Sequence, residues 1–400
     1  MHILQLCKKF PYPLHSGEAV AVTYMARALH EHGVMLDLLS MNTLRHTVDT
    51  SNAQAHLPHY RVIRTVSVDN RVKPIPALYN LLWRRSYHIQ RFVSRAYAQA
   101  LTDMLQSTHY DVVQLESLYL APYIPLIREH SSAIVAMRAH NLEGEIWERI
   151  TANAHGIKQW YLRQLTRQLY RYEQQVMQQY DLLLTMSERD LEQYHQLGYA
   201  GEACVVPIGL DIAGYRPTDK AYHGKPTLAF IGTLDWQPNI EGLAWFLSAV
   251  WPAVLTRMHH AELYIAGKGE LPDFLRVPLA GVTVVGEVDS AVEFIDQHAI
   301  HVVPLLSGSG MRVKILEAMA MARVVVSTKI GMEGICVESG REAFVTDGAE
   351  HMTNTILECV SRSQLSLIGK NARARIIQNY SYIKSAEIVL NRYLLQLKRK

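Results

Sequence analysis

The stretch from Gly308 to Ala320, GSGMRVKILEAMA, combines residue types that bind phosphate. An apolar run over His301–Leu305 predicts a strand that ends in this Gly-Ser turn, and a helix is expected to begin near Met311. Glycines let a backbone approach a ligand closely, and the free N–H groups at a helix start bind anions. Arg312 and Lys314 there oppose the helix dipole by about 0.3–1 kcal/mol each, which a bound diphosphate would offset. An ordinary Ser-Gly turn with two solvated basic residues fits the same pattern.

Glu317 is the carboxylate within this otherwise apolar helical run. A carboxylate at this position can accept two hydrogen bonds from vicinal hydroxyls, such as those of a ribose. A favourable surface charge near a helix start is the alternative interpretation.

Other predicted strands also end in glycine turns. Gly232 ends FIG, Gly267 and Lys268 lie in IAGKG, and Ser16-Gly17 precedes a helix in HSGEA. Each turn can admit a phosphate, base or sugar, and each also fits an ordinary turn or a serine N-cap. Neither IAGKG nor GSGMRV has the third glycine of G-x-G-x-x-G, so a nicotinamide site is not supported.

His140 follows a buried apolar run in AMRAHN, with Arg138 and Asn141 beside it. Polar residues directly after a strand are candidates for ligand contact, although a single histidine is more often structural or on the surface. The chain has no D-x-D, H-E-x-x-H or G-x-S-x-G motif, so neither a metal site nor a cofactor is expected.

Short apolar runs alternate with helical patterns along the whole chain. Strands are predicted over residues 2–7, 34–41, 111–116, 133–141, 181–187, 227–234, 261–269, 281–288, 300–306 and 323–328, and a strand with a turn over 203–211. Helices are predicted over residues 18–33, 78–107, 119–130, 143–179, 239–258 and from 350 onward. This alternation is typical of α/β proteins with parallel sheets covered by helices on both faces.

The pattern runs twice, which predicts two doubly wound, Rossmann-like domains over 1–205 and 206–380. The polar segment 214–226, with two prolines and two glycines, has the composition of a linker. A last helix over 381–400 could pack back on the first domain. Ligands of open α/β sheets bind at the carboxyl ends of the strands, so the glycine turns are expected to face a cleft between the domains.

Bulk properties exclude several classes of protein. A net charge of +3 over 400 residues is too small for a nucleic-acid-binding protein. The four cysteines are scattered, which favours a reducing compartment. The N-terminal apolar run is too short for a signal peptide, and no run of 18 apolar residues is present. We expect a cytoplasmic protein, with peripheral contact to the inner face of the cytoplasmic membrane left open.

In chain order, the motifs resemble those of retaining glycosyltransferase family 4, or glycosyltransferase group 1, which has the GT-B fold. The resemblance covers nearly the whole chain through HSGEA, RAHN, PIGLD, FIGTLDWQPNIEG, IAGKG, GSGMRVKILEAMAMARVVVST and GMEGI. The most specific block is similar to a subgroup with a G-x-G-x-R-x-K-x-L-E-A pattern among bacterial polysaccharide and cell-surface glycan transferases.

The resemblance implies roles for two groups of residues. Residues implied in catalysis are His140, beside the donor sugar, and Arg312 and Lys314, which neutralise the leaving diphosphate. Residues implied in donor binding are Gly17, Gly232, Lys268, Ser309, Gly310, Arg312, Lys314 and Glu317, the last on the ribose hydroxyls.

The sequence departs from the family's pattern at two places. The first Glu of the family's E-x7-E motif is replaced by Ser309, and TLDWQPNIEG lacks the basic pair that many members carry.

The implied reaction is transfer of a sugar from a nucleotide-diphosphate sugar to a glycan or lipid-linked acceptor in bacterial polysaccharide synthesis. The family implies a metal-independent, hexosyltransferase-like enzyme that retains the anomeric configuration. The sequence identifies neither the donor base and sugar nor the acceptor. Two alternatives stay open: a GT-B-fold sugar-nucleotide epimerase, for which no carboxylate pair is visible near the glycine turns, and a non-catalytic nucleotide-sugar-binding subunit.

Residues 158–180 mix basic and aromatic side chains on a predicted helix. These are Lys158, Arg163, Arg167 and Arg171 together with Trp160, Tyr161, Tyr170 and Tyr172. Such a helix could lie against anionic lipid and reach a lipid-linked acceptor. A solvated helix that packs through its Tyr and Leu residues is the more common structure for such a pattern.

Overall fold

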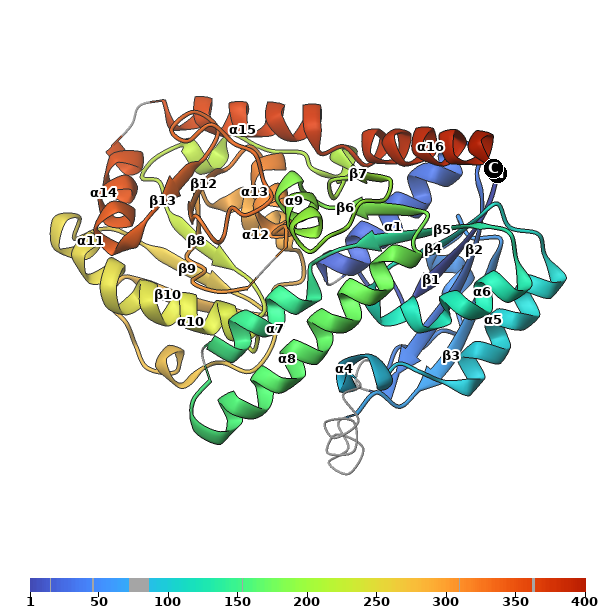
Figure 1. Cartoon of the computed structure of the whole chain (residues 1–400). Coiled ribbons are helices and arrows are strands. Elements are labelled where there is room, and N and C mark those ends of the chain that lie inside the picture. The colour runs from blue at the N-terminus through green and yellow to red at the C-terminus, as the bar shows by residue number, and fades with distance from the viewer. Residues whose placement is uncertain (15, 45–46, 72–85, 153, 309, 362–363) are drawn as a thin grey trace. The chain divides into compact units, whose positions relative to one another are not determined.

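The computed structural model describes residues 1–14, 16–44, 47–71, 86–152, 154–308, 310–361 and 364–400. The chain divides into two units, each built on its own parallel sheet (Figure 1). Unit 1 comprises Met1–Gly209 and Tyr382–Lys400, and unit 2 comprises Leu210–Ser381. The predicted fold class, α/β with two doubly wound sheets, is confirmed.

The sheet of unit 1 has seven strands in the order β3-β2-β1-β4-β5-β6-β7, all parallel. The strands are β1 His2–Cys7, β2 Met35–Thr43, β3 Val62–Val68, β4 Val112–Leu115, β5 Ile134–Ala139, β6 Leu182–Thr185 and β7 Ala203–Val205. Every residue of β1, β4, β5 and β6 is buried, as expected for strands with helices on both faces. Because β1, β4 and β5 are adjacent and parallel, their carboxyl ends are neighbours.

Helices cover both faces of this sheet. They are α1 Gly17–Glu31, α2 Ala53–His56, α4 Tyr87–Gln90, α5 Arg95–Ser107, α6 Ile124–His130, α7 Glu143–Ala152, α8 Gly156–Val176, α9 Glu188–Gln196 and α16 Tyr382–Arg399. Helix α16 packs on α1, and its Ala386, Val389 and Tyr393 enter the same core cluster as β1.

Two helices that the sequence predicts as continuous are interrupted. Part of the predicted helix 78–107 lies outside the described residues, and its described part breaks before α5, where the Ser94 hydroxyl caps Tyr97 N at 3.3 Å. The predicted helix 143–179 is divided into α7 and α8. Gly156 begins α8 with a φ of +62°, a left-handed conformation that stops a continuous right-handed helix.

The sheet of unit 2 has six parallel strands in the order β10-β9-β8-β11-β12-β13. They are β8 Leu228–Ile231, β9 Leu263–Ala266, β10 Val282–Gly286, β11 Ile300–Val303, β12 Val324–Thr328 and β13 Phe344–Thr346. The helices are α10 Gln237–Trp245, α11 Trp251–Arg257, α12 Ala291–Gln297, α13 Val313–Ala320, α14 Gly348–Ser361 and α15 Leu365–Asn379. A π-helical stretch, Phe246–Val250, joins α10 to α11.

The segment 214–226, expected to be a linker, packs on unit 2. Tyr222 donates its hydroxyl hydrogen to Ala322 O at 2.5 Å, and Thr218 bonds to Asp296 through its N–H and its hydroxyl. The buried Arg323 guanidinium donates to Thr218 O at 2.5 Å. Because a buried guanidinium needs acceptors, Arg323 holds this polar segment in place.

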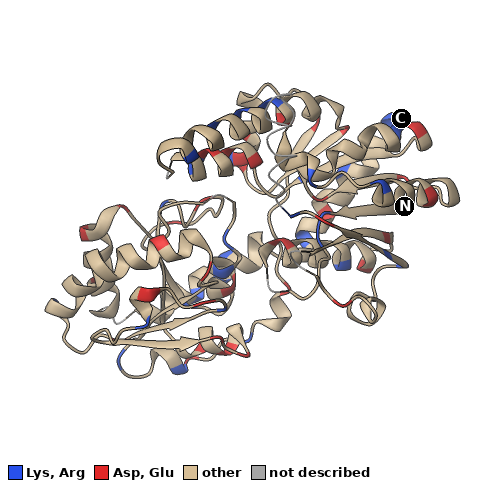
Figure 2. Cartoon of the chain, turned by 90° about the horizontal axis from the view of Figure 1, so that it is seen from below, with Lys and Arg blue, Asp and Glu red and all other residues tan. Residues whose placement is uncertain are grey.

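Charged side chains are distributed over both units. Figure 2 shows Lys and Arg positions interspersed with Asp and Glu along the described part of the ribbon. No helix in the described part of the chain combines the length and apolar character needed to cross a membrane.

Candidate functional site

The turn before α13 has the backbone that its glycines suggest. Gly308 has a φ of +99° and Gly310 a φ of +82°, a region that side-chain-bearing residues rarely adopt. Ser309 lies outside the described residues. Helix α13 begins at Val313 with Arg312 at its N-cap, two residues later than predicted. Its first turn carries no acidic residue, so the positive end of the helix dipole is not neutralised there.

Two basic side chains lie at this helix start. Arg312 Nη1 donates to Gly310 O at 2.5 Å, and its guanidinium carbon is 6.0 Å from the centre of the Trp236 ring. The arginine is thereby folded over the turn and held against an aromatic face. Lys314 Nζ is 2.9 Å from Glu317 Oε2, an ion pair within α13. The structure therefore brings Gly310, Arg312, Lys314 and Glu317 together.

Glu317 is buried, and each of its carboxylate oxygens has one polar neighbour. Oε2 pairs with Lys314, while Oε1 accepts a hydrogen bond from the hydroxyl of Tyr215 at 3.1 Å. Sequence reasoning missed Tyr215 because it begins the segment that we expected to be a linker. The sequence offered one indication of its role, which is that Tyr215 is an aromatic residue at the edge of a polar stretch. The outcome is an oriented carboxylate, suited to accept hydrogen bonds from hydroxyl groups.

Gly232 and Gly267 let the turns after β8 and β9 touch. A Cβ on Gly267 would lie 1.8 Å from Gly232 O, and a Cβ on Gly232 would lie 2.8 Å from Asn239 Nδ2. These glycines thus have a packing role that is independent of any ligand. Lys268 is mostly exposed, and its Nζ is 3.8 Å from Glu287 Oε1. Roles for Gly232 and Lys268 in donor binding stay predictions.

In unit 1, Gly17 is the first residue of α1. The Ser16 hydroxyl accepts a hydrogen bond from Ala19 N at 3.3 Å, so the N-cap interpretation of Ser16 is confirmed. Glu18 in the first turn is 3.6 Å from Lys8 Nζ. A carboxylate already faces this helix start, and a role of Gly17 in binding the donor stays a prediction.

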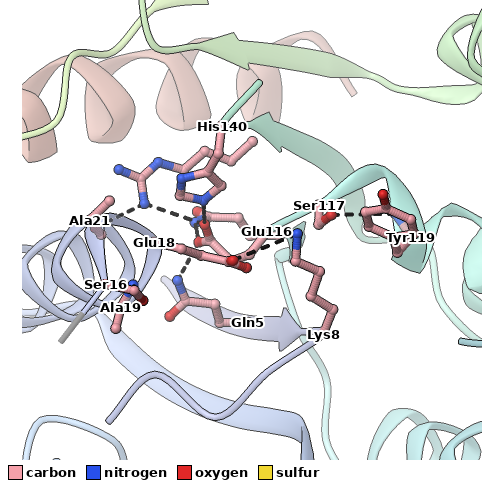
Figure 3. Close-up of polar contacts among 12 residues, drawn as sticks. Gln5, Lys8, Ser16, Glu18, Ala19, Ala21, Glu116, Ser117, Tyr119 and His140 are labelled. Carbon is pink, nitrogen blue, oxygen red and sulfur yellow. Dashed lines mark hydrogen bonds and ion pairs between the residues drawn. The ribbon is translucent and has the colours of Figure 1, made fainter. Parts of the chain in front are cut away.

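Lys8, at the end of β1, is surrounded by acceptors that sequence reasoning did not identify. Its Nζ is 3.6 Å from Glu18 (Figure 3). The same atom is 3.7 Å from Glu143 and 4.8 Å from the centre of the Tyr119 ring. The Tyr119 hydroxyl donates to Glu143 Oε2 at 2.9 Å. Burial opposes the charge on Lys8, but the two carboxylates outweigh it and raise its pKa.

His140 follows β5 directly and contacts a buried carboxylate at the end of β4. Its Nε2 is 2.8 Å from Glu116 Oε2 (Figure 3). Arg138 Nη1 is 3.3 Å from the same oxygen and donates to Ala21 O at 3.0 Å. Arg138 lies inside β5, within the predicted strand 133–141, and is completely buried. Burial opposes ionisation of Glu116, yet Arg138 and His140 lower its pKa to about 2.

The second oxygen of Glu116 is held by two glutamines. Gln5 on β1 and Gln114 on β4 both donate their side-chain amides to Oε1. The Tyr60 hydroxyl donates to Gln5 Oε1, and the Tyr393 hydroxyl donates to Gln114 Oε1, each at 2.6 Å. Because these tyrosines fix the amide orientations, the amide N–H groups must face the carboxylate.

Residues 225–362, within unit 2, match the family model described as "Glycosyl transferases group 1". This segment of unit 2 is therefore similar to group 1 glycosyl transferases. This match spans the turns at Gly232 and Lys268 and all of α13. Arg312, Lys314 and Glu317 therefore lie within the segment that matches the family model. Within the described ranges, no three His, Cys, Asp or Glu side chains gather closely enough to hold a metal ion.

Whole-chain comparisons extend the similarity beyond this segment. An "uncharacterized 44.6 kDa protein in cps region" of Klebsiella pneumoniae is 23% identical over 393 residues, covering 92% of this chain and 94% of that protein. Sucrose-phosphate synthase of Thermosynechococcus elongatus superposes with a TM-score of 0.70 at 16% identity, covering 100% of both chains. HepE of Anabaena, in complex with UDP and glucose, gives 0.65 at 14% identity, covering 97% of this chain and 98% of that chain. The fold is the GT-B fold, as predicted.

Proposed function

We propose that this protein is a retaining, family 4 type glycosyltransferase that transfers a sugar from a nucleotide-diphosphate sugar to a glycan or lipid-linked acceptor. The observation that carries the proposal is the α13 site within the segment that matches the group 1 family model. There Arg312 and Lys314 lie at a helix start, and the carboxylate of Glu317 is oriented by Tyr215. The relative in a cps region supports a place in bacterial polysaccharide synthesis.

The chemistry expected of the α13 site follows from where charge develops. When the bond between the anomeric carbon and the diphosphate breaks, negative charge grows on the diphosphate. Arg312, Lys314 and the N–H groups at the start of α13 would stabilise that charge. Glu317 would accept hydrogen bonds from the ribose hydroxyls, which leaves Lys314 available to the diphosphate.

Retention and metal independence are part of the same proposal. The acceptor oxygen bonds to the anomeric carbon on the face that the diphosphate leaves, and the acceptor proton passes to a diphosphate oxygen. The two basic side chains take the place of a divalent ion. Transfer should therefore continue in EDTA, and proton NMR should show the same anomeric configuration in donor and product. Loss of transfer in EDTA, or inversion, would contradict these two parts.

Incubation of the purified protein with UDP- and GDP-sugars tests the activity. UDP-glucose is the first donor to try, because the similar HepE structure holds UDP and glucose. Donor hydrolysis or transfer supports the proposal, an epimerised donor supports a GT-B-fold epimerase, and binding alone supports a non-catalytic subunit. Arg312→Ala and Glu317→Ala should abolish turnover. Arg257→Ala, on α11 and exposed, is the matched control and should keep it; near wild-type rates in all three variants would disprove the site.

We propose further that a membrane contact, if the acceptor is lipid-linked, is made by the first turn of α8. Ile157 is 87% exposed and Trp160 57%, next to the exposed Lys158. By contrast, Tyr170 and Tyr172 pack against the core of unit 1. Exposed apolar side chains beside a basic residue are typical of helices that bind an anionic lipid surface.

Flotation with phosphatidylglycerol vesicles at low and high salt tests this contact. Binding is expected at low salt, weaker binding at high salt, and loss in a variant with Ile157→Ser and Trp160→Ser. Val93→Ser, which alters an exposed apolar residue elsewhere in unit 1, is the control and should still float. Absence of the wild-type protein from the vesicle fraction would remove the membrane contact and leave the transferase proposal intact.

A further inference from the structure

Glu116 is a completely buried carboxylate that contacts His140 at the carboxyl edge of the unit 1 sheet. Its carboxylate is inaccessible, while the His140 side chain that it contacts is 12% exposed. The two residues follow adjacent parallel strands, β4 and β5, at their carboxyl ends, where ligands of such sheets bind. The ring of His140 therefore links Glu116 to this edge of the sheet.

An ionised carboxylate can only accept hydrogen bonds. The Nε2 atom of His140, 2.8 Å from Glu116 Oε2, must consequently carry a proton whether the ring is neutral or charged. In the neutral ring, the lone pair then lies on Nδ1. We propose that Glu116 is a positioning residue, which holds His140 as the Nε2–H tautomer so that Nδ1 accepts a hydrogen bond from a sugar hydroxyl.

The surroundings of Glu116 favour this role. Gln5 and Gln114 occupy Oε1, and their amide orientations are set by Tyr60 and Tyr393, so the carboxylate cannot rotate freely. Oε2 is left to Arg138 and His140. Arg138 lies in β5 and keeps the carboxylate ionised, while His140 is the partner that reaches the surface. The inference rests on the proposed function only in taking the ligand to be a sugar.

The tautomer can be measured in the unaltered protein. Long-range proton–nitrogen correlation NMR on protein with ¹⁵N-labelled histidine rings distinguishes Nε2–H from Nδ1–H, and comparison with His140→Gln assigns the signals. The proposal requires Nε2–H for neutral His140. An Nδ1–H ring would overturn it. Because no substrate is present, this result is independent of whether the protein transfers sugar.

Substitution of Glu116 tests the consequence. Glu116→Gln keeps the size of the side chain and removes its charge, so the ring should become a mixture of tautomers. With an active donor–acceptor pair, kcat/KM should fall by about 10- to 100-fold, as when one charge-assisted hydrogen bond is lost. A folded variant with the wild-type tautomer and rate would overturn the proposal. Should this variant fail to fold, the wild-type tautomer alone still decides.

Glu173→Gln is the matched control. Glu173 is also completely buried in unit 1, but it accepts hydrogen bonds from Gly144 N at 3.1 Å and the Tyr194 hydroxyl at 3.0 Å. Its substitution should leave the His140 tautomer unchanged. A tautomer change in both variants would mean that any buried carboxylate of unit 1 acts on His140 through packing, which would contradict a specific role of Glu116. If the wild type and both variants show the expected tautomers but none of them transfers sugar, the result would count against the proposed function and not against the role of Glu116.

Discussion

At the scale of single residues, each candidate site contains a carboxylate whose partner comes from another part of the chain. Arg312, Lys314 and Glu317 stand at neighbouring positions in a recognisable pattern, and the structure places them together. Tyr215 contacts Glu317 from 102 positions away, and Glu116 meets His140 from another strand. Such contacts depend on the sheet order, which no local pattern contains. For this reason the hydrogen-bond partners of both candidate sites were not predicted.

Tyr215→Phe tests the role of the hydroxyl that orients Glu317. The variant keeps the ring in place and removes one hydrogen bond, so stability should fall by only about 1 kcal/mol. If the donor is a UDP-sugar, as the proposed function allows, binding of UDP measured by titration calorimetry should weaken several-fold because the carboxylate is no longer oriented. Tyr222→Phe is the control, since its hydroxyl bonds to Ala322 O just beyond the C-terminal end of α13, whereas Glu317 and Lys314 lie within the helix. Equal UDP affinity in Tyr215→Phe and wild type would show that this hydrogen bond does not serve the nucleotide.

Glu173 predicts a pH dependence of stability. Burial raises its pKa to about 7, despite hydrogen bonds from Gly144 N and Tyr194. A carboxyl with a raised pKa binds its proton more tightly in the folded state. Its contribution is therefore fully present below pH 4.5 and is lost as the pH rises through about 7, by about 3 kcal/mol. Urea unfolding between pH 5 and 8 should show this loss in wild type and not in Glu173→Gln. Parallel pH profiles would contradict the assignment.

At the scale of elements, hydrophobic periodicity predicted most strands and helices and missed their interruptions. Periodicity records which residues are apolar, and a left-handed glycine such as Gly156 does not alter it. The serine that begins α5 is visible in the sequence, but serine also occurs inside helices. The order of strands in each sheet follows from packing and connection rules, so a parallel α/β arrangement could be predicted while individual contacts could not.

Gly267→Ala tests whether the turns after β8 and β9 require their close approach. An added Cβ would overlap Gly232 O at 1.8 Å, so the two turns must separate. Unit 2 should lose at least about 2 kcal/mol of stability, which is typical of overpacking at a backbone contact. Chemical denaturation followed by Trp fluorescence would measure the loss. Gly214→Ala, where a Cβ meets open space, should unfold like wild type. Matching midpoints for both variants would show that the turns rearrange freely.

At the scale of the whole molecule, the last helix completes the unit in which the chain begins. The chain leaves unit 1 after Gly209 and returns to it at Tyr382. Helix α16 then packs on α1, and its Tyr393 hydroxyl bonds to Gln114 Oε1, one contact away from Glu116. The stability of the His140 site therefore depends on residues at the opposite end of the sequence.

Tyr393→Phe measures that dependence. Loss of the hydroxyl leaves the Gln114 carbonyl buried without this donor, which should cost about 1–3 kcal/mol. Hydrogen exchange should accelerate in β1 and β4 and stay unchanged in the strands of unit 2. Tyr382→Phe, whose hydroxyl bonds to Glu31 at an exposed position of the same helix, should change stability by less than about 0.5 kcal/mol. If exchange rose equally in both units, α16 would stabilise the chain as a whole. Faster exchange confined to unit 1 would instead show that α16 supports the sheet edge that carries His140.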